Sequence, residues 1–126
     1  MVKRWVTGWK LDEGDRKRLL ALFPPLFANV VADHVTLRTG TDYATLLPLE
    51  RSGEIVGEID DGRGVQALVV SIGGTTARTD GSTYHITWSL DRAAGRRAVE
   101  SNQVIAELGW RALPKPVPVR LHPGRF

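Results

Sequence analysis

The sequence predicts an α+β domain built mostly of antiparallel strands. Short segments with the alternation of half-buried strands recur along the chain. Turn-forming residues join several of them: residues 60–64 link two such segments as a hairpin, and Asp80-Gly81 precedes another. Only two segments have apolar residues at helical spacing. A chain of 126 residues has the usual size of one domain, so we expect residues 1–126 to share a single core.

The first part of the chain predicts a strand, a helix and a second strand. Residues 2–9 alternate as a strand, and residues 33–38 do so again. Between them, Asp12 is the expected N-cap of a helix, because its carboxylate can accept a backbone N–H of the first turn. Leucines at helical spacing follow it, and Pro24-Pro25 ends the helix.

The second part predicts a hairpin, a further strand, a short helix and a final strand. The hairpin consists of residues 54–59 and 65–72, and the next strand of residues 84–90. Ser101 is the expected N-cap of the helix, which ends before Gly109. Residues 117–121 lie between prolines, which indicates an edge strand.

Two four-residue motifs stand out within the predicted strands. His34-Val35-Thr36-Leu37 and His85-Ile86-Thr87-Trp88 both read histidine, aliphatic, threonine, apolar, and they lie 51 positions apart. Side chains two apart on a strand share a face, so each histidine faces the same way as its threonine. Arg38 and Ser89 continue these polar faces if the strands are regular. A single histidine on a half-buried strand is more often structural, but the repeated context favours a site.

The residue types of the two motifs suit acid–base chemistry at phosphorus. A neutral imidazole accepts a proton and an imidazolium donates one, and both forms exist near neutral pH. A threonine hydroxyl can donate a hydrogen bond to a phosphate oxygen. Trp5, Trp9 and Tyr43 are the candidate aromatics for stacking on a nucleobase.

The motif pair resembles the two-histidine (2H) phosphoesterase superfamily, which is defined by two H-x-(S/T)-x motifs on central strands. The chain looks most similar to the cyclic phosphodiesterase domain of fungal tRNA ligases and its small stand-alone relatives. The segments 7–12 and 100–102 also resemble that group, and the similarity spans about residues 3–110. The chain is shorter than is common in the superfamily, so we expect outer strands or a substrate-covering loop to be missing or shortened.

This resemblance implies a fold, a reaction and a set of site residues. The fold has two pseudo-symmetric halves, with helices packed outside and the histidine strands meeting at a central cleft. The reaction is metal-independent hydrolysis of a ribose 2′,3′-cyclic phosphate, on RNA or a nucleotide, to a 2′-phosphate. His34 and His85 act as acid and base in an order left open, and Thr36 and Thr87 hold the phosphate oxygens. The expected substrate-binding residues are Arg38, Ser89, Trp9 and Tyr43.

Two other kinds of function remain open from the sequence. The same site could perform 2′–5′ RNA ligation or cleave 2′–5′ phosphodiesters, since both reactions occur in the superfamily. A non-catalytic module that binds RNA or a nucleotide is the alternative of another class. The intact threonine beside each histidine argues against that last alternative.

Composition limits cofactors and location. The chain has no cysteine and a formal net charge of +3, a mild bias toward anionic partners. Neither motif supplies the third ligand that a metal site needs, so we expect no metal and no other cofactor. The apolar runs are too short to span a bilayer and the N-terminus lacks a signal-peptide pattern. We therefore expect a cytoplasmic monomer that acts on an RNA end or nucleotide carrying a cyclic phosphate, without a membrane or an obligate protein partner.

Overall fold

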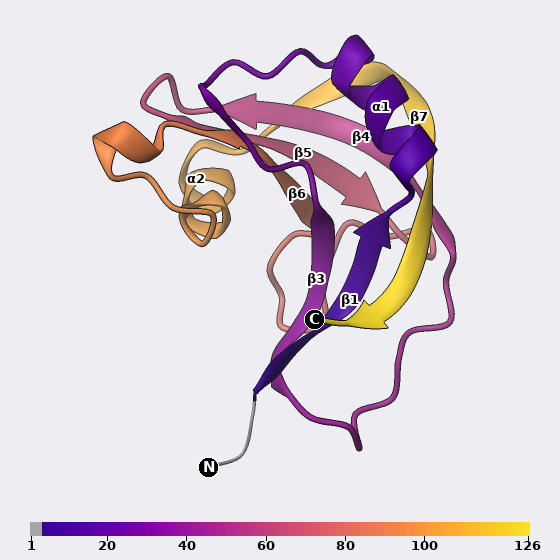
Figure 1. The fold of residues 1–126 in the computed structure, drawn as a ribbon. Helices are drawn as coiled ribbons and strands as arrows, with labels where there is room; N and C mark the ends of the chain where they lie inside the picture. The colour runs from indigo at the N-terminus through magenta and orange to yellow at the C-terminus, as the bar shows by residue number, and fades with distance from the viewer. Residues whose placement is uncertain (1–3) are drawn as a thin grey trace.

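Within residues 4–126, the sheet has seven strands, each antiparallel to its neighbours, in the order β2-β6-β5-β4-β7-β1-β3 (Figure 1). The computed structural model describes residues 4–126, so the start of the strand predicted from Val2 lies outside the described residues. The expected α+β class with antiparallel strands is confirmed. The elements are β1 (Trp5–Leu11), α1 (Glu13–Leu22), β2 (Asn29–Val30), β3 (His34–Thr41), β4 (Ser52–Asp60), β5 (Val65–Ser71), β6 (His85–Leu90), a short 3₁₀ helix (Arg92–Ala94), α2 (Glu100–Leu108) and β7 (Arg111–Arg125).

The two faces of the sheet carry separate apolar clusters, and each cluster includes one helix. Leu19 of α1 is fully buried in the same cluster as Leu68 of β5. Ile105 of α2 packs with Ala67, the neighbour of Leu68 that points to the opposite face. Because β5 is covered on both sides, residues 65–70 are all buried, which explains their nearly unbroken apolar sequence. In the described chain, neither helix is long and apolar enough to cross a membrane.

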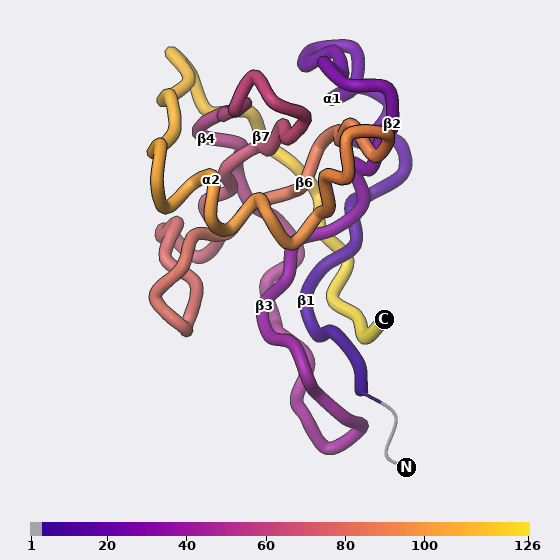
Figure 2. The backbone as a smooth tube through the Cα atoms, turned by 90° about the vertical axis from the view of Figure 1, so that its left-hand side faces the viewer, coloured from indigo at the N-terminus to yellow at the C-terminus, as the bar shows by residue number. Residues whose placement is uncertain are grey.

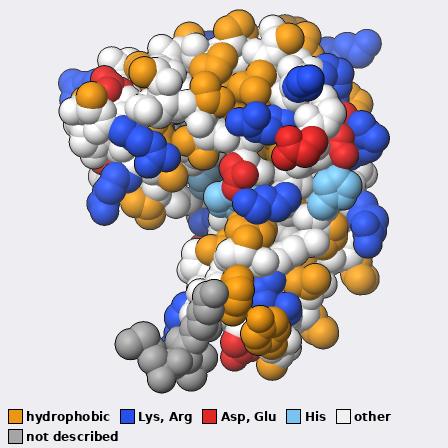
Figure 3. All heavy atoms as spheres, viewed as in Figure 1, with side chains coloured by type: hydrophobic (Ala, Val, Ile, Leu, Met, Phe, Trp, Pro, Cys, Tyr) orange, Lys and Arg blue, Asp and Glu red, His pale blue; other side chains and the backbone are white. Residues whose placement is uncertain are grey.

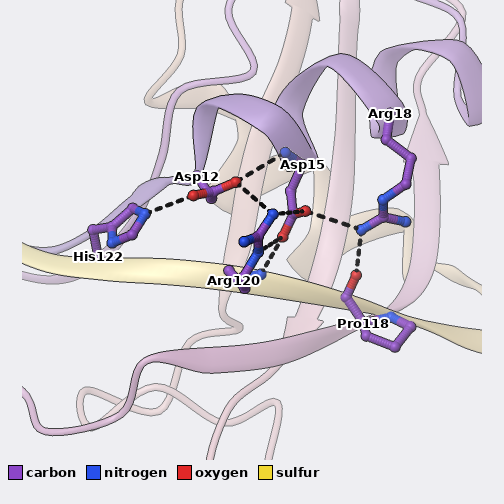
Figure 4. Close-up of polar contacts among 6 residues, drawn as sticks. All are labelled: Asp12, Asp15, Arg18, Pro118, Arg120 and His122. Atoms are coloured by element: carbon purple, nitrogen blue, oxygen red, sulfur yellow. Dashed lines mark hydrogen bonds and ion pairs between the residues drawn. The ribbon is translucent and has the colours of Figure 1, made fainter.

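The last strand differs from the edge strand expected at residues 117–121. β7 lies between β4 and β1 in the sheet, so the edge-strand prediction is wrong. Residues 111–112 and 117–120 pair with β4, and residues 121–125 pair with β1, so each paired part of β7 has a single neighbouring strand. Residues 113–116, which include two of the prolines, lie opposite Val56 outside the regular pairing. A proline is tolerated where its missing N–H faces the unpaired side. Pro118 fits this explanation, because its carbonyl accepts a hydrogen bond from Arg18 Nη2 at 2.8 Å and not from a strand (Figure 4).

Arg120 lies where β7 changes its partner, and the first turn of α1 holds it there (Figure 4). Its backbone N–H donates to Asp15 Oδ2 at 2.7 Å, and its carbonyl accepts from the backbone N–H of Asp12 at 3.2 Å. The Arg120 guanidinium adds a second contact, Nη2 to Asp15 Oδ1 at 3.0 Å. Asp15 is buried, and the Arg120 hydrogen bonds hold the pKa of its carboxyl at about 2, against the opposing effect of burial. His122 Nε2–H donates to Asp12 Oδ1 at 2.9 Å.

The shared strand lets the sheet curl until its two distant motif strands meet. β3 and β6 contact each other, although β5, β4, β7 and β1 all stand between them in the sheet order. Figure 1 shows β3 passing in front of the body while β7 wraps around it, and Figure 2 shows β1 and β3 projecting together below the rest of the chain. The curl therefore brings together residues from the two ends of the sheet.

Three of the four predicted helix ends agree with the structure, including the end of α1 at Leu22, just before Pro24-Pro25. Asp12 caps α1 as expected, with its Oδ2 accepting the N–H of Asp15 at 3.1 Å, and Gly109 caps the end of α2. Ser101 is not the N-cap of α2, because the helix already begins at Glu100. The Ser101 hydroxyl lies 2.9 Å from the hydroxyl of Thr87, so a tertiary contact uses the group that would have capped the helix.

Replacing Asp15 with Asn should lower the free energy of unfolding by about 1–2 kcal/mol at pH 7. A shift of one pKa unit corresponds to about 1.36 kcal/mol, and solvent around the exposed Arg120 side chain reduces the full effect. A carboxyl whose folded pKa is depressed stabilises the fold above its ordinary pKa of 3.8 and loses that contribution as pH falls toward 2. Urea unfolding of both proteins at several pH values measures the difference.

Glu13→Gln, in the same helical turn, is the matched control and should change stability much less. The difference in free energy of unfolding between Asp15→Asn and the unchanged protein should become smaller below pH 3.8. A difference that stays constant down to pH 2 would show that Asp15 does not contribute through its charge.

Candidate active site

Both motif strands carry a β-bulge at the same motif position. Opposite β1, Thr36 pairs with Gly8 and Arg38 pairs with Thr7, so Leu37 is the extra residue of β3. A bulge of this kind breaks the alternation of side chains between the two faces of the sheet. The residues after it therefore point to the face opposite to the one expected for a regular strand. The close approach of β1 at this point needs a glycine, because a Cβ on Gly8 would lie 2.2 Å from the carbonyl oxygen of Val35.

The second bulge lies in β6. Thr87 pairs with Ala67 and Ser89 pairs with Gln66, so Trp88 is the extra residue. Trp88 is fully buried on the α1 side, where its indole N–H donates to the carbonyl of Phe23 at 2.7 Å. In both motifs the bulged residue is therefore the fourth one.

One hollow of about 190 Å³ collects the polar residues of both motifs. It opens between β3, β6 and the start of α2, and both histidines and both threonines line it. Histidine atoms, in pale blue, come to the surface at two separate places on the face that Figure 3 shows, one of them beside the notch above the projecting β1–β3 region. The lining residues are His34, Thr36, Thr39, Arg78, His85, Thr87, Ala98, Val99 and Asn102.

His85 is the more buried of the two imidazoles. Its Nδ1 lies 2.8 Å from the carbonyl oxygen of Thr83, which can only accept, so Nδ1 carries a proton and Nε2 is the nitrogen left for the hollow. Burial lowers the pKa of His85, the Thr83 hydrogen bond opposes this shift, and the charges of Arg78 and His34 lower the pKa further. The net effect lowers the pKa of His85 and so favours its neutral form.

His34 has a carboxylate partner where His85 has a carbonyl. Its Nδ1 lies 3.0 Å from Asp33 Oδ2, and Lys10 Nζ bonds the same oxygen at 2.5 Å. Burial would raise the pKa of Asp33, but the hydrogen bonds from Lys10 and His34 outweigh it and keep the pKa below its ordinary value. The ring of Phe126 packs edge-on against His34, with the ring centroids 5.0 Å apart. Asp33 and Phe126 thus fix the orientation of this imidazole.

The two threonines line the hollow with different neighbours. Thr87 is buried, and its hydroxyl lies 2.9 Å from Ser101 Oγ and donates to the carbonyl of Ala98 at 3.3 Å. The hydroxyl of Thr36 has no hydrogen-bond partner among the described residues. Thr36 is consequently the hydroxyl that is free to bind a ligand, while Thr87 also joins β6 to α2.

The four residues predicted to bind substrate lie outside the hollow. The Leu37 bulge turns Arg38 to a different hollow, on the other side of β3, and Thr39 takes the position that a regular strand would give to Arg38. The Trp88 bulge likewise turns Ser89 into the interior, where its hydroxyl donates to Gln66 Oε1.

None of the three aromatics predicted to stack on a base, Trp5, Trp9 and Tyr43, lines the hollow. Each of them packs elsewhere. Trp9 is buried, with its indole N–H on the carbonyl of Glu50 at 2.8 Å and its ring edge-on to Tyr84. Tyr43 is 77% exposed and packs against Trp5 and Arg125 on the projecting β1–β3 region.

Sequence reasoning overlooked Arg78, Asp33, Thr39 and Asn102. Asp33 directly precedes the first motif, and a carboxylate next to a candidate acid–base histidine could have been noticed as its orienting partner. Arg78 belongs to a turn ending in Asp80-Gly81, and an arginine in such a turn reads as a solvated residue. Asn102 belongs to the segment 100–102 that carries part of the family resemblance.

Among residues 4–126, no group of three or more His, Cys, Asp or Glu side chains is placed to hold a metal ion. In comparisons with known proteins, no family model matches the chain, and no curated protein or solved structure matches it either. The functional interpretation therefore depends on the residues of the hollow themselves.

The titration of His85 tests the electrostatics of the hollow without any substrate. We expect a midpoint below 6.5, because burial disfavours the imidazolium, and an Nδ1–H tautomer above it. NMR of labelled histidine measures both. Arg78→Met should raise the midpoint, since it removes a positive charge that faces His85, whereas Arg111→Met, at an exposed ion pair with Glu58, should leave it unchanged. A His85 midpoint above 6.5 would contradict the buried, neutral imidazole.

Proposed function

We propose that the protein is a metal-independent phosphodiesterase of the two-histidine class, which hydrolyses ribose 2′,3′-cyclic phosphate ends of RNA or nucleotides to a 2′-phosphate. One observation carries the proposal: the histidine and threonine of two motifs 51 positions apart line a single hollow. A pair of structural histidines would not need to share an open site, or to have threonines beside both of them.

The matching bulges support an origin of the site from two related halves. In each half the motif strand places histidine and threonine on the hollow and then bulges at the fourth residue, Leu37 or Trp88. Bulges often lie next to active sites, where they direct side chains and end a regular pairing. We therefore regard the hollow as the cleft between two pseudo-symmetric halves, with α1 packed on the opposite face of the sheet and the start of α2 forming one wall of the hollow.

The partners of the two imidazoles support different roles for them. His85, neutral and with Nε2 unprotonated, is the base that removes a proton from water. His34, whose Nδ1 faces the carboxylate of Asp33, is the acid that protonates the departing ribose oxygen. Water adds to phosphorus, the bond from phosphorus to that ribose oxygen breaks, and the proton lost by water is balanced by the one given by His34. The protonated His85 and neutral His34 exchange protons with solvent before the next turnover.

The threonines stabilise the charge that builds on phosphorus. Thr36 offers an unoccupied hydroxyl to a non-bridging oxygen, and Thr87 lies beside it with Ser101 as its partner. Donors that are already in place when charge develops need no reorganisation during the reaction, which is the main advantage of such sites.

Replacing either His34 or His85 with Ala should reduce turnover of nucleoside 2′,3′-cyclic monophosphates by about 10²–10⁴-fold, the usual contribution of one acid–base group. The double variant should lose much less than the product of the single losses, because the pair acts as a unit. Phosphorus NMR of the product measures the rate and shows which oxygen keeps the phosphate.

His122→Ala is the matched control, since this third histidine lies outside the hollow and is half exposed. Its turnover should equal that of the unchanged protein, and activity should persist in excess EDTA. Two single variants with full activity on every diester tested would rule out the site. Loss of activity in EDTA, restored by a divalent ion, would rule out a metal-independent reaction.

Asp33→Asn should lower kcat by about 10- to 100-fold while the fold is kept. A hydrogen bond to a charged group contributes about 1.5–3 kcal/mol, and each 1.36 kcal/mol in the barrier is a factor of ten. Asp42→Asn is the control, because Asp42 lies away from the hollow and its contact with the Ala44 N–H survives in Asn. Equal rates for Asp33→Asn and the unchanged protein would show that the carboxylate does not assist His34.

A further inference from the structure

Arg78 is an almost buried cation in the wall of the hollow. Its side chain is only 10% exposed, and it lines the same space as both histidines. It comes from the loop between β5 and β6 and reaches across to β3, where Nη1 donates to the carbonyl of Thr36 at 3.3 Å. Nη2 donates to Asn102 Oδ1 at 3.0 Å, so the guanidinium joins β3, the loop and α2.

The remaining contacts of Arg78 leave part of its donor capacity unused. A guanidinium has five N–H groups. Nε donates to Ser82 Oγ at 2.7 Å and lies 3.3 Å from Asp80 Oδ1, while Nη1 and Nη2 each use one N–H as described. One N–H on each terminal nitrogen therefore has no acceptor among the described residues.

The charge of Arg78 is compensated only on the solvent side. Its ion-pair partner, Asp80, is 61% exposed. Asp80 contacts Nε and not the two terminal nitrogens of the guanidinium. Toward the hollow, the partners of Arg78 are neutral oxygens of Thr36 and Asn102. A buried cation with neutral partners is best completed by an anion, and two N–H groups on one guanidinium suit the two oxygens of a phosphate.

We propose that Arg78 binds the phosphate group of the substrate through these two N–H groups, and that the hollow recognises the sugar-phosphate without reading the base. Contacts with Thr36, Asn102, Ser82 and Asp80 already fix the guanidinium in the wall that it shares with both histidines, so the bound phosphate lies beside His34 and His85. The statement about substrate rests on the proposed function, whereas anion binding by Arg78 does not.

The size and lining of the hollow support recognition of the phosphate alone. Its volume of about 190 Å³ is below the roughly 300–1,000 Å³ of most small-molecule sites, so only part of a nucleotide enters. The lining contains no Phe, Tyr or Trp on which a base could stack. The exposed apolar residue of the lining is Val99, which is 61% exposed and offers a base only a small apolar contact.

Direct titration with inorganic phosphate tests the anion site. In the unchanged protein, we expect saturable shifts of the Arg78 Nε–H and of the His85 ring signals. Arg78→Met should weaken phosphate binding by about 10- to 100-fold, the size expected for charged hydrogen bonds. Arg78→Lys should recover part of the affinity, since it keeps the charge but not the paired donors, and Arg111→Met should bind as the unchanged protein does.

Saturable phosphate binding without any movement of the Arg78 and His85 signals would overturn the proposal, and this result needs no variant to fold. Equal affinity in a folded Arg78→Met variant would overturn it as well. In turnover assays, Arg78→Met should raise KM more than it lowers kcat, and the four cyclic nucleotides should have KM values within about tenfold of one another. A larger spread would refute recognition without base reading.

The two proposals fail in different ways. Phosphate binding that depends on Arg78, in a protein that turns over no phosphodiester, supports the anion site and overturns the proposed reaction. Turnover that depends on His34 and His85 but is unaffected by Arg78→Met supports the reaction and overturns the role of Arg78.

Discussion

The exchange of partners along β7 is the constraint on which the rest of the molecule depends. Strand pairing holds β7 to β4 up to residue 120 and to β1 from residue 121, so one strand joins what would otherwise be two sheets. At the exchange point, the backbone N–H and carbonyl of Arg120 bond to Asp15 and Asp12. A backbone group without a strand partner is costly when it is shielded from water, and the start of α1 supplies the missing partners. The curl that follows from this joint places β3 beside β6.

The sequence was sufficient for the motifs and most elements but not for the walls of the hollow. Alternation correctly placed each histidine with its threonine, because no bulge interrupts those three residues. It misplaced Arg38 and Ser89, since bulges depend on the register of the neighbouring strand, which is a tertiary property. The same limit applies to β7. Its prolines indicate an unpaired side, but they do not show that the first part of the strand is unpaired on one side and the last part on the other.

Arg78 shows a second limit of sequence reasoning. Its local context is a turn, and turns normally lie in solvent. Its burial results from contacts with Thr36 and Asn102, which are distant in sequence and meet the loop only after the sheet has curled. Likewise, His34 and His85 have the same motif but different surroundings, a carboxylate for one and a carbonyl for the other. Identical residue patterns can therefore have different electrostatic surroundings, and this difference is the basis of the opposite roles proposed for the two histidines.

The position of β7 also sets the order in which the chain can assemble during synthesis. β4, β5 and β6 follow one another closely and can pair as they leave the ribosome, and β1 can pair with β3 in the same way. The pairing of β1 and that of β4 become parts of one continuous sheet only when residues 111–125 have emerged, because β7 is the strand that pairs with both. Until then β1 and β4 each expose an unpaired edge, the kind of surface that promotes association between chains. Pairings between strands so distant in sequence form slowly, so the continuous sheet is expected to form late in folding.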